Sequence, residues 1–164
     1  MRTVIGIDPG THCGFAVRHP DGDMHSGVWD LSGSRYEGGG MRYVRLHRLL
    51  CELLDCIDWG DQPQSEFVLV AYEEVHRHLG TAAAHIYGGI VAVITQECEQ
   101  RGVPYLGIPV GTIKKYATGR GNSGKEAMIA AALEKWPQLW TAQTISSDEA
   151  DARWIAEYAA TQEM

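Results

Sequence analysis

The sequence predicts an α/β fold: a five-stranded mixed sheet, made of an antiparallel meander plus parallel strands, flanked by helices. Two patterns predict this architecture. Three short apolar segments separated by tight turns open the chain, which is typical of an antiparallel meander. Helical and strand-like segments then alternate, which is typical of parallel strands joined by crossover helices. A composition of 45% apolar and 21% charged residues fits such a folded domain.

Each expected element has a local reason. Turns at residues 8–11 and 20–23 delimit the first strands, and the apolar run at residues 67–72 is typical of a buried central strand. Leucines at helical spacing predict an amphipathic helix from residue 41, and Ser146 three positions before Glu149 predicts a helix start. The expected strands are residues 3–7, 13–18, 24–31, 67–72 and 105–108, and the expected helices are residues 41–57, 81–100, 124–136 and 146–160.

The length and charge of the chain restrict its class. With 164 residues, we expect a single domain spanning residues 1–164. A net charge of −7, from 14 basic and 21 acidic residues, argues against a protein that coats nucleic acid by electrostatics alone. No apolar run reaches the ~18–20 residues of a membrane span, and Asp8 comes too early for a signal peptide. Four scattered cysteines without a CxxC pair favour reduced thiols in the cytoplasm.

Four carboxylates are candidate metal ligands. Asp8 and Glu73 end apolar strands, where open α/β sheets bind ligands, while Asp148 and Asp151 share one face of the final helix. Three of them also have a structural explanation, since Asp8 caps a turn, Glu73 ends a strand and Asp148 favours a helix N-terminus, whereas Asp151 lies beyond the first helical turn. Carboxylates brought together by the fold would require a cation. Oxygen ligands select Mg²⁺, with Mn²⁺ as a substitute, and two such ions can drive phosphodiester hydrolysis.

Basic side chains gather between these acidic motifs. Four of them fall within 12 residues that also contain three glycines, which allow close approach of the backbone to phosphate. The alternative interpretation is a solvated surface loop. Binding through such groups would be salt-sensitive and independent of DNA sequence, which suits recognition of a branched shape. The candidate DNA-binding residues are Lys114, Lys115, Arg120, Lys125, His76, Arg77 and His78.

Together these motifs resemble one nuclease family. Residues 5–11 (IGIDPGT), 72–75 (YEEV) and 148–152 (DEADA), with the basic segment between them, resemble in order the motifs of RuvC-type Holliday junction resolvases (crossover junction endodeoxyribonucleases), especially a phage or prophage branch. The resemblance implies an RNase H-like fold, a homodimer and paired symmetric nicking of four-way DNA junctions with two Mg²⁺ ions. It implies metal ligation, with a catalytic role, for Asp8, Glu73, Asp148 and Asp151. It implies a backbone or transition-state role for Lys114 and Lys125.

The expected chemistry follows from those roles. Asp8 would bridge the ions, Glu73 and Asp151 would each complete one coordination shell, and Asp148 would hold or orient the metal ion of the attacking water. Lys125 would stabilise the developing negative charge. The sequence departs from the family after its second acidic motif, where no aromatic residue is available to wedge into a junction. The manner of junction opening and the preferred cleavage sequence therefore stay open.

Other readings of the sequence remain. A nuclease of the same fold could prefer flaps, splayed arms or single-stranded DNA, and a non-catalytic junction-binding protein is a further alternative. The sequence motif at residues 6–11 also resembles a phosphate loop of actin-like ATPases, but a chain of this length leaves no room for the second domain of those proteins. The apolar, small-residue helix 81–100 is a candidate dimer interface, and we expect Ile90→Asp to give monomers. We expect a cytoplasmic location in a bacterial cell or phage-infected host, with no membrane partner.

Overall fold

The computed structural model describes residues 2–57, 64–77, 80–141 and 145–162. The strands are β1 (Thr3–Asp8), β2 (His12–Arg18), β3 (Met24–Asp30), β4 (Val68–Glu74) and β5 (Tyr105–Pro109). The helices are α1 (Met41–Cys56), α2 (Gln64–Phe67), α3 (Thr81–Arg101), α4 (Val110–Thr118), α5 (Lys125–Lys135), the 3-10 helix η1 (Pro137–Thr141) and α6 (Ser147–Ala159). None of the described helices is both long and apolar enough to cross a membrane.

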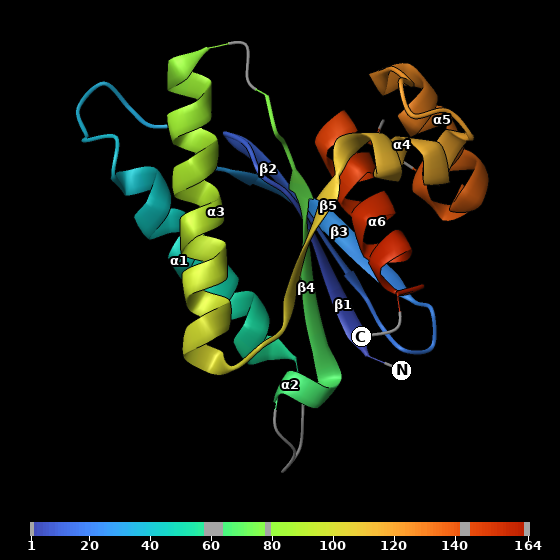
Figure 1. Cartoon of the computed structure of the whole chain (residues 1–164), viewed down its shortest axis with the longest axis horizontal. Coiled ribbons are helices and arrows are strands. Elements are labelled where there is room, and N and C mark those ends of the chain that lie inside the picture. The colour runs from blue at the N-terminus through green and yellow to red at the C-terminus, as the bar shows by residue number, and fades with distance from the viewer. Residues whose placement is uncertain (1, 58–63, 78–79, 142–144, 163–164) are drawn as a thin grey trace.

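The five strands form one mixed sheet in the order β3-β2-β1-β4-β5 (Figure 1). Strands β1, β2 and β3 pair antiparallel, whereas β1 with β4 and β4 with β5 pair parallel. The expected meander and the expected parallel strands are therefore both confirmed. The two central strands, β1 and β4, run side by side in the same direction, so their carboxyl ends meet at one edge of the sheet.

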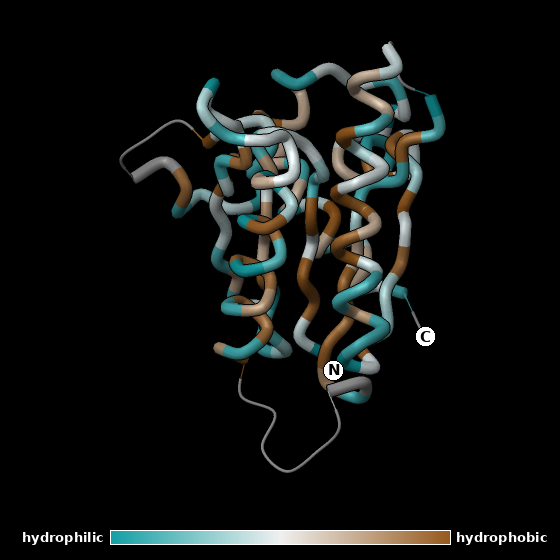
Figure 2. The backbone as a smooth tube through the Cα atoms, turned by 90° about the vertical axis from the view of Figure 1, so that its left-hand side faces the viewer, coloured by the Kyte–Doolittle hydropathy of each residue, from teal (hydrophilic) through white to brown (hydrophobic). Residues whose placement is uncertain are grey.

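Helices cover both faces of the sheet, with α1 and α3 on one face and α4, α5 and α6 on the other (Figure 1). Alternate residues of β1 serve the two layers, since Ile5 and Ile7 pack under α1 and α3 while Val4 packs with α6. The view onto the α1 and α3 side shows polar and apolar residues alternating along the helices in front of apolar strands (Figure 2). Leu46, Leu50 and Leu54 form the buried stripe of α1.

The basic segment differs from expectation, because its first part is a helix. Helix α4 starts after Pro109 and ends at Gly119, whose φ of 82° is the left-handed conformation that glycine adopts readily. Gly111 and Thr112 have low helix propensity, so the local sequence did not indicate a helix. Burial of Ile113 against the sheet stabilises it. The short elements α2 and η1 were not expected either.

The predicted role of Ile90 as an interface residue is wrong. Ile90 is fully buried within the chain, where it packs in the core layer between α3 and the sheet. Its neighbour Gly89 lies against the ring of Tyr43 of α1, and a Cβ there would lie 2.5 Å from that ring. Helical spacing placed Ile90 on an apolar face without showing which of the two apolar faces points inward. The exposed face of α3 instead presents His85, Gly88 and Ala92.

Candidate active site

The candidate site is built at the carboxyl ends of the two central strands. Asp8 is the last residue of β1, and Glu73 lies at the end of β4. Ile7 pairs with Tyr72 in the parallel register, which places Asp8 beside Glu73 on neighbouring strands. Pro9 and Gly10 turn the chain immediately after Asp8. The sheet therefore presents two carboxylates at one edge, as the sequence predicted.

Helix α6 brings the other two carboxylates to the same edge. Ser146 caps its start, since the Ser146 hydroxyl accepts a hydrogen bond from the Glu149 backbone N–H at 3.1 Å. The reciprocal half of the expected capping box is absent from these described residues. The Glu149 carboxylate instead accepts a hydrogen bond from the Ser26 hydroxyl at 2.5 Å. This contact fixes the first turn of α6, which carries Asp148, on the sheet.

Two glycines of the sheet allow α6 to lie unusually close. A Cβ at Gly14 of β2 would collide with the backbone carbonyl of Asp148. A Cβ at Gly6 of β1 would collide with the carbonyl of Ala152, one residue after Asp151. The helix backbone therefore rests directly on the sheet, and its two aspartates reach the strand ends.

The pKa shifts show that the four carboxylates interact. Burial raises the pKa of Asp8 well above its ordinary value, and the charges of Glu73, Asp151 and Asp148 raise it further. Burial and then Asp151 raise the pKa of Glu73 to about 7. Burial raises the pKa of Asp151 to about 6, an effect to which Asp148 adds and against which Lys114 acts. Such a cluster of acids favours either bound protons or a bound cation.

One oxygen of this cluster is also unpartnered. Oδ1 of Asp151 is buried and accepts no hydrogen bond in the part of the chain that the structure describes. A buried carboxylate oxygen without a partner is costly, and a hard cation would satisfy it. The ligand atoms of the four residues are all oxygens, which suits Mg²⁺ or Mn²⁺. The residues present therefore fit a divalent metal.

Two lysines complete the charge balance of the site. Lys125 lowers the pKa of Asp8 and of Asp151, and Lys114 lowers the pKa of Glu73 and of Asp151. Both cations thus lie near the carboxylates. Lys125 occupies the first turn of α5, where a positive charge opposes the helix dipole. This unfavourable placement is consistent with a role outside the stability of the helix.

The other basic candidates lie farther out. Lys115 of α4 and Arg120 beyond it are exposed, and neither is among the charges that shift the pKa of Asp8, Glu73 or Asp151. His76 is exposed and its Nε2 lies 3.6 Å from a Glu74 oxygen, while Arg77 is exposed beside it. His78 lies outside the described residues. The structure therefore separates an inner pair of lysines from an outer set of basic residues.

Sequence reasoning missed two side chains near the site. The Tyr87 hydroxyl donates to the Glu73 carbonyl at 3.0 Å and accepts from the Val75 backbone N–H at 2.9 Å, which secures the end of β4 to α3. Cys13 lies buried near Asp8, and burial together with the Asp8 charge raises its pKa to about 12, so the thiol stays protonated. No local pattern marked either residue, because both act through the folded arrangement.

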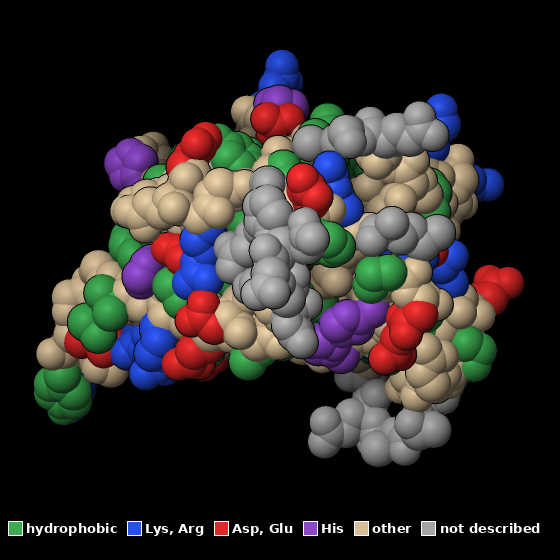
Figure 3. All heavy atoms as spheres, turned by 90° about the horizontal axis from the view of Figure 1, so that it is seen from below, with side chains coloured by type: hydrophobic (Ala, Val, Ile, Leu, Met, Phe, Trp, Pro, Cys, Tyr) green, Lys and Arg blue, Asp and Glu red, His purple; other side chains and the backbone are tan. Residues whose placement is uncertain are grey.

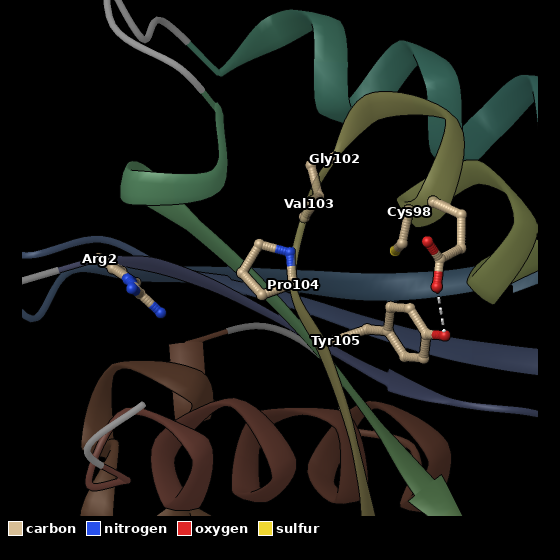
Figure 4. A pocket seen from close by; sticks show the side chains of 7 residues that line it. Arg2, Cys98, Gly102, Val103, Pro104 and Tyr105 are labelled. Carbon is tan, nitrogen blue, oxygen red and sulfur yellow. Dashed lines mark hydrogen bonds between the residues drawn. The ribbon is translucent and has the colours of Figure 1, made fainter.

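Two hollows in the surface lie at opposite ends of the sheet. A hollow of about 320 Å³ adjoins the site and is lined by Pro9, Gly10, Val75 and Tyr87 among others. A hollow of about 510 Å³ lies at the opposite end, where Arg2, Pro104 and Tyr105 line it and none of the candidate catalytic residues takes part (Figure 4). The view onto that end shows acidic and basic side chains interspersed rather than gathered by sign (Figure 3).

Known proteins resemble this chain in sequence. No family model matches the chain. The crossover junction endodeoxyribonuclease RuvC of Nitratidesulfovibrio vulgaris strain Hildenborough is 32% identical over 126 residues, covering 76% of this chain and 71% of the relative. The RuvC of Anaeromyxobacter sp. strain K is 31% identical over 154 residues, covering 93% and 77%.

Solved structures that resemble this chain also include RuvC proteins. Thermus thermophilus RuvC superposes with a TM-score of 0.71 at 25% identity, covering 96% of this chain and 93% of that one. The same protein in complex with a Holliday junction substrate gives a TM-score of 0.74 at 24% identity, covering 98% and 93%. The mixed sheet with its flanking helices is thus an RNase H-like fold. The chain belongs to the RuvC family of crossover junction endodeoxyribonucleases.

Proposed function

We propose that this chain is a structure-selective, metal-dependent endodeoxyribonuclease that resolves four-way DNA junctions by paired symmetric nicks. The single observation that carries the proposal is the cluster of four interacting carboxylates, with an unpartnered Asp151 oxygen, at the carboxyl edge of the sheet. Family membership supports the substrate, since the related T. thermophilus RuvC has been solved with a Holliday junction. The chain would act as a single nuclease domain in the cytoplasm, where its DNA substrate would be found.

The four carboxylates would hold two Mg²⁺ ions, with Mn²⁺ as a substitute. No three of these described side chains bring one oxygen each within 4.8 Å of one another, so the cluster is wider than a single cation requires. Two ions share such a spread set of donors more readily. When bound, they would activate a water molecule and stabilise the leaving oxygen of the phosphodiester.

The protein side chains would divide the remaining work. Asp8, Glu73 and Asp151 would hold the catalytic centre in place, and Asp148 would hold or orient the ion whose water attacks phosphorus in line. The bond from phosphorus to the 3′ oxygen breaks, which leaves 3′-hydroxyl and 5′-phosphate ends. Lys125, whose charge already acts on Asp8 and Asp151, would stabilise the negative charge that develops on the phosphate. Lys114, whose charge acts on Glu73, would likewise offset negative charge at the site.

The outer basic residues would hold the DNA backbone. Lys115 and Arg120 are exposed around the end of α4, and Arg77 is exposed after β4. Contacts from these positions to phosphates would follow the shape of a branched DNA without reading bases. Metal ions bound at the carboxylates would also reduce the negative potential near the site, which eases the approach of DNA to a chain of net charge −7.

Cleavage of end-labelled DNA tests this proposal. The substrates are a mobile four-way junction, a splayed arm and a linear duplex, each incubated with Mg²⁺ and with excess chelator. We expect paired symmetric nicks on the junction with the unchanged chain and with the control Glu134→Gln, whose exposed carboxylate lies on α5. Asp8→Asn should bind the junction without cutting it.

The other outcomes separate the alternatives. Cleavage of splayed arms or single strands in preference to junctions would keep the catalytic residues and replace the substrate. Tight junction binding without cleavage in any metal would indicate a binding protein and would contradict the catalytic roles. Full activity of Asp8→Asn would contradict the assignment of the site itself.

A further inference from the structure

A second cluster of metal-binding side chain types lies outside the candidate active site, where α1 meets α3. His47 and Cys51 are one turn apart on α1, and Glu97 faces them from α3. One ligand atom from each of the three residues lies within 4.8 Å of the other two. Among the described residues, this is the one group of three such side chains that meets the spacing, and the four carboxylates at the strand ends do not meet it.

The separations among the three side chains lie close to the edges of a tetrahedral zinc site. Zinc binds His nitrogen and carboxylate oxygen at about 2.0–2.2 Å and Cys sulfur at about 2.3 Å. Tetrahedral angles then place the ligand atoms roughly 3.3–3.6 Å apart. In the structure Nε2 of His47 lies 3.0 Å from a Glu97 oxygen and 3.6 Å from Sγ of Cys51, and Sγ lies 3.2 Å from the other Glu97 oxygen.

The acid in this cluster is held in place by its neighbours. Glu97 is only 4% exposed, although it lies on a helix at the surface of the chain. Arg101 donates from Nε to Oε1 of Glu97 at 2.5 Å and from Nη1 to Asp55 at 2.6 Å. Burial acts to raise the pKa of Glu97, but Arg101, Cys51 and His47 together hold it below its ordinary value. The carboxylate is therefore ionised and oriented toward His47.

The thiol completes the donor set once its proton leaves. The Cys51 thiol donates a hydrogen bond to a Glu97 oxygen at 3.2 Å, so without a metal its proton faces the carboxylate. A divalent cation would replace that proton, which would pass to solvent, and would relieve the repulsion between thiolate and carboxylate. His47 has an exposed side chain, so an ion can reach the cluster from solvent.

We propose that His47, Cys51 and Glu97 bind one Zn²⁺ ion that joins α1 to α3. The donor set of nitrogen, sulfur and oxygen suits zinc and is a poor match for Mg²⁺. Three protein ligands leave the fourth position to water. Arg101 donates to Oε1 of Glu97 and orients the carboxylate, as hydrogen-bonded neighbours of metal ligands commonly do. The ion would add a bond between two helices that already meet through apolar contacts and the Arg101–Asp55 ion pair, at a site independent of the proposed nuclease activity.

Cobalt substitution tests this proposal directly. Protein without a polyhistidine tag is titrated with Co²⁺ in saturating Mg²⁺, which occupies the carboxylate site. We expect one Co²⁺ per chain with a thiolate-to-cobalt charge-transfer band and the visible absorption of tetrahedral cobalt, both displaced by Zn²⁺. Cys51→Ser should lose the charge-transfer band, and His47→Gln should raise the dissociation constant by roughly tenfold or more. Cys56→Ser, which changes an exposed cysteine of the same helix, should behave like the unchanged chain.

A thermal measurement provides a second readout. Zn²⁺ should raise the Tm of the unchanged chain and of Cys56→Ser, because an ion that binds only the folded state stabilises it. The same addition should leave the Tm of Cys51→Ser unchanged, and this variant also shows by its own Tm that the chain is folded. Absence of the charge-transfer band in the unchanged chain, or its persistence in Cys51→Ser, would overturn the proposal. Loss of cobalt binding in Asp8→Asn rather than Cys51→Ser would overturn it too.

Discussion

The backbone carbonyl of Asp148 lies in the space that a side chain at Gly14 would occupy. Gly14 belongs to β2 and pairs with Asp8, so one glycine sets the distance between helix α6 and strand β1, which together carry three candidate ligands. The absence of a side chain in the sheet therefore has a consequence for the site. It lets α6 rest on the sheet and brings its aspartates to the strand ends.

Gly14→Ala should impair both stability and cleavage. The added Cβ forces α6 outward, and overpacking of this kind costs about 1–3 kcal/mol. Asp148 and Asp151 should move away from Asp8, and junction cleavage in Mg²⁺ should fall by at least roughly tenfold, since small displacements of catalytic groups are costly. Urea unfolding and single-turnover cleavage measure the two effects. Gly38→Ala is the control, because a Cβ there meets nothing. Full cleavage activity in a destabilised Gly14→Ala variant would mean that Gly14 does not position the aspartates of the site.

Much of the fold could be predicted because its signals are local. Apolar runs and turns marked the five strands, and the strand ends pointed to Asp8 and Glu73 before the sheet register was known. The spacing of Asp148 and Asp151 on one helix face was sufficient to add them to the set. Helix α4 was missed because its low propensity is offset by burial of Ile113, which depends on tertiary contacts.

The rest of the site depends on contacts between distant parts of the chain. Tyr87 reaches the end of β4 from α3, and Glu97 reaches His47 across 50 positions of sequence. The spacing of four between His47 and Cys51 was the one local signal for that cluster. The inward face of α3 was equally ambiguous in sequence, which is why Ile90 was placed on the wrong side.

Tyr87→Phe should weaken cleavage without removing any charged group of the site. The substitution leaves the Glu73 carbonyl and the Val75 N–H without their shared partner, which costs about 1 kcal/mol and loosens the end of β4. We expect a lower kcat with little change in junction binding, measured by single-turnover cleavage and by gel shift. Tyr105→Phe removes an exposed hydroxyl contact to Glu99 and should keep full activity. Equal activity of both variants would mean that Tyr87 does not position Glu73.

Removal of metal should make stability depend on pH. Without metal, Glu73 and Asp151 have pKa values of about 7 and about 6, against ordinary values of 4.5 and 3.8. The folded state then binds more protons than the unfolded state, so the free energy of unfolding falls as pH rises from about 4 to about 7. Mg²⁺ replaces those protons, and its stabilising effect should grow over the same range.

Thermal unfolding between pH 5 and pH 8, in chelator and in Mg²⁺, measures this effect. The difference in Tm between the two conditions should widen with pH for the unchanged chain. It should be smaller for Asp8→Asn, which removes one of the interacting acids. A Tm in chelator that rises from pH 5 to pH 7 would contradict the raised pKa values.

The salt dependence of junction binding should identify the outer basic residues. Each lysine or arginine that contacts a phosphate contributes about 1 to the slope of log Kd against log salt concentration. Lys115→Ala and Arg120→Ala should therefore weaken binding and each reduce the slope by about 1. Arg48→Ala is the control, since Arg48 lies on α1 and its Nε is 3.7 Å from an oxygen of Glu52. An unchanged slope in both variants would remove α4 from the DNA-binding surface.

Homodimer formation should depend on the exposed face of α3 rather than on Ile90. His85, Gly88 and Ala92 are exposed and fall on one ridge, where small side chains allow a second helix to approach closely. Ala92→Arg should give folded monomers, measured by light scattering, with an unchanged circular dichroism spectrum. Paired nicking should be lost, because nicking the two equivalent strands of one junction needs two active sites. Ile90→Asp should instead unfold the chain, because it buries an unpaired charge. Ala130→Arg on the exposed side of α5 should stay dimeric. A dimeric Ala92→Arg would place the interface elsewhere.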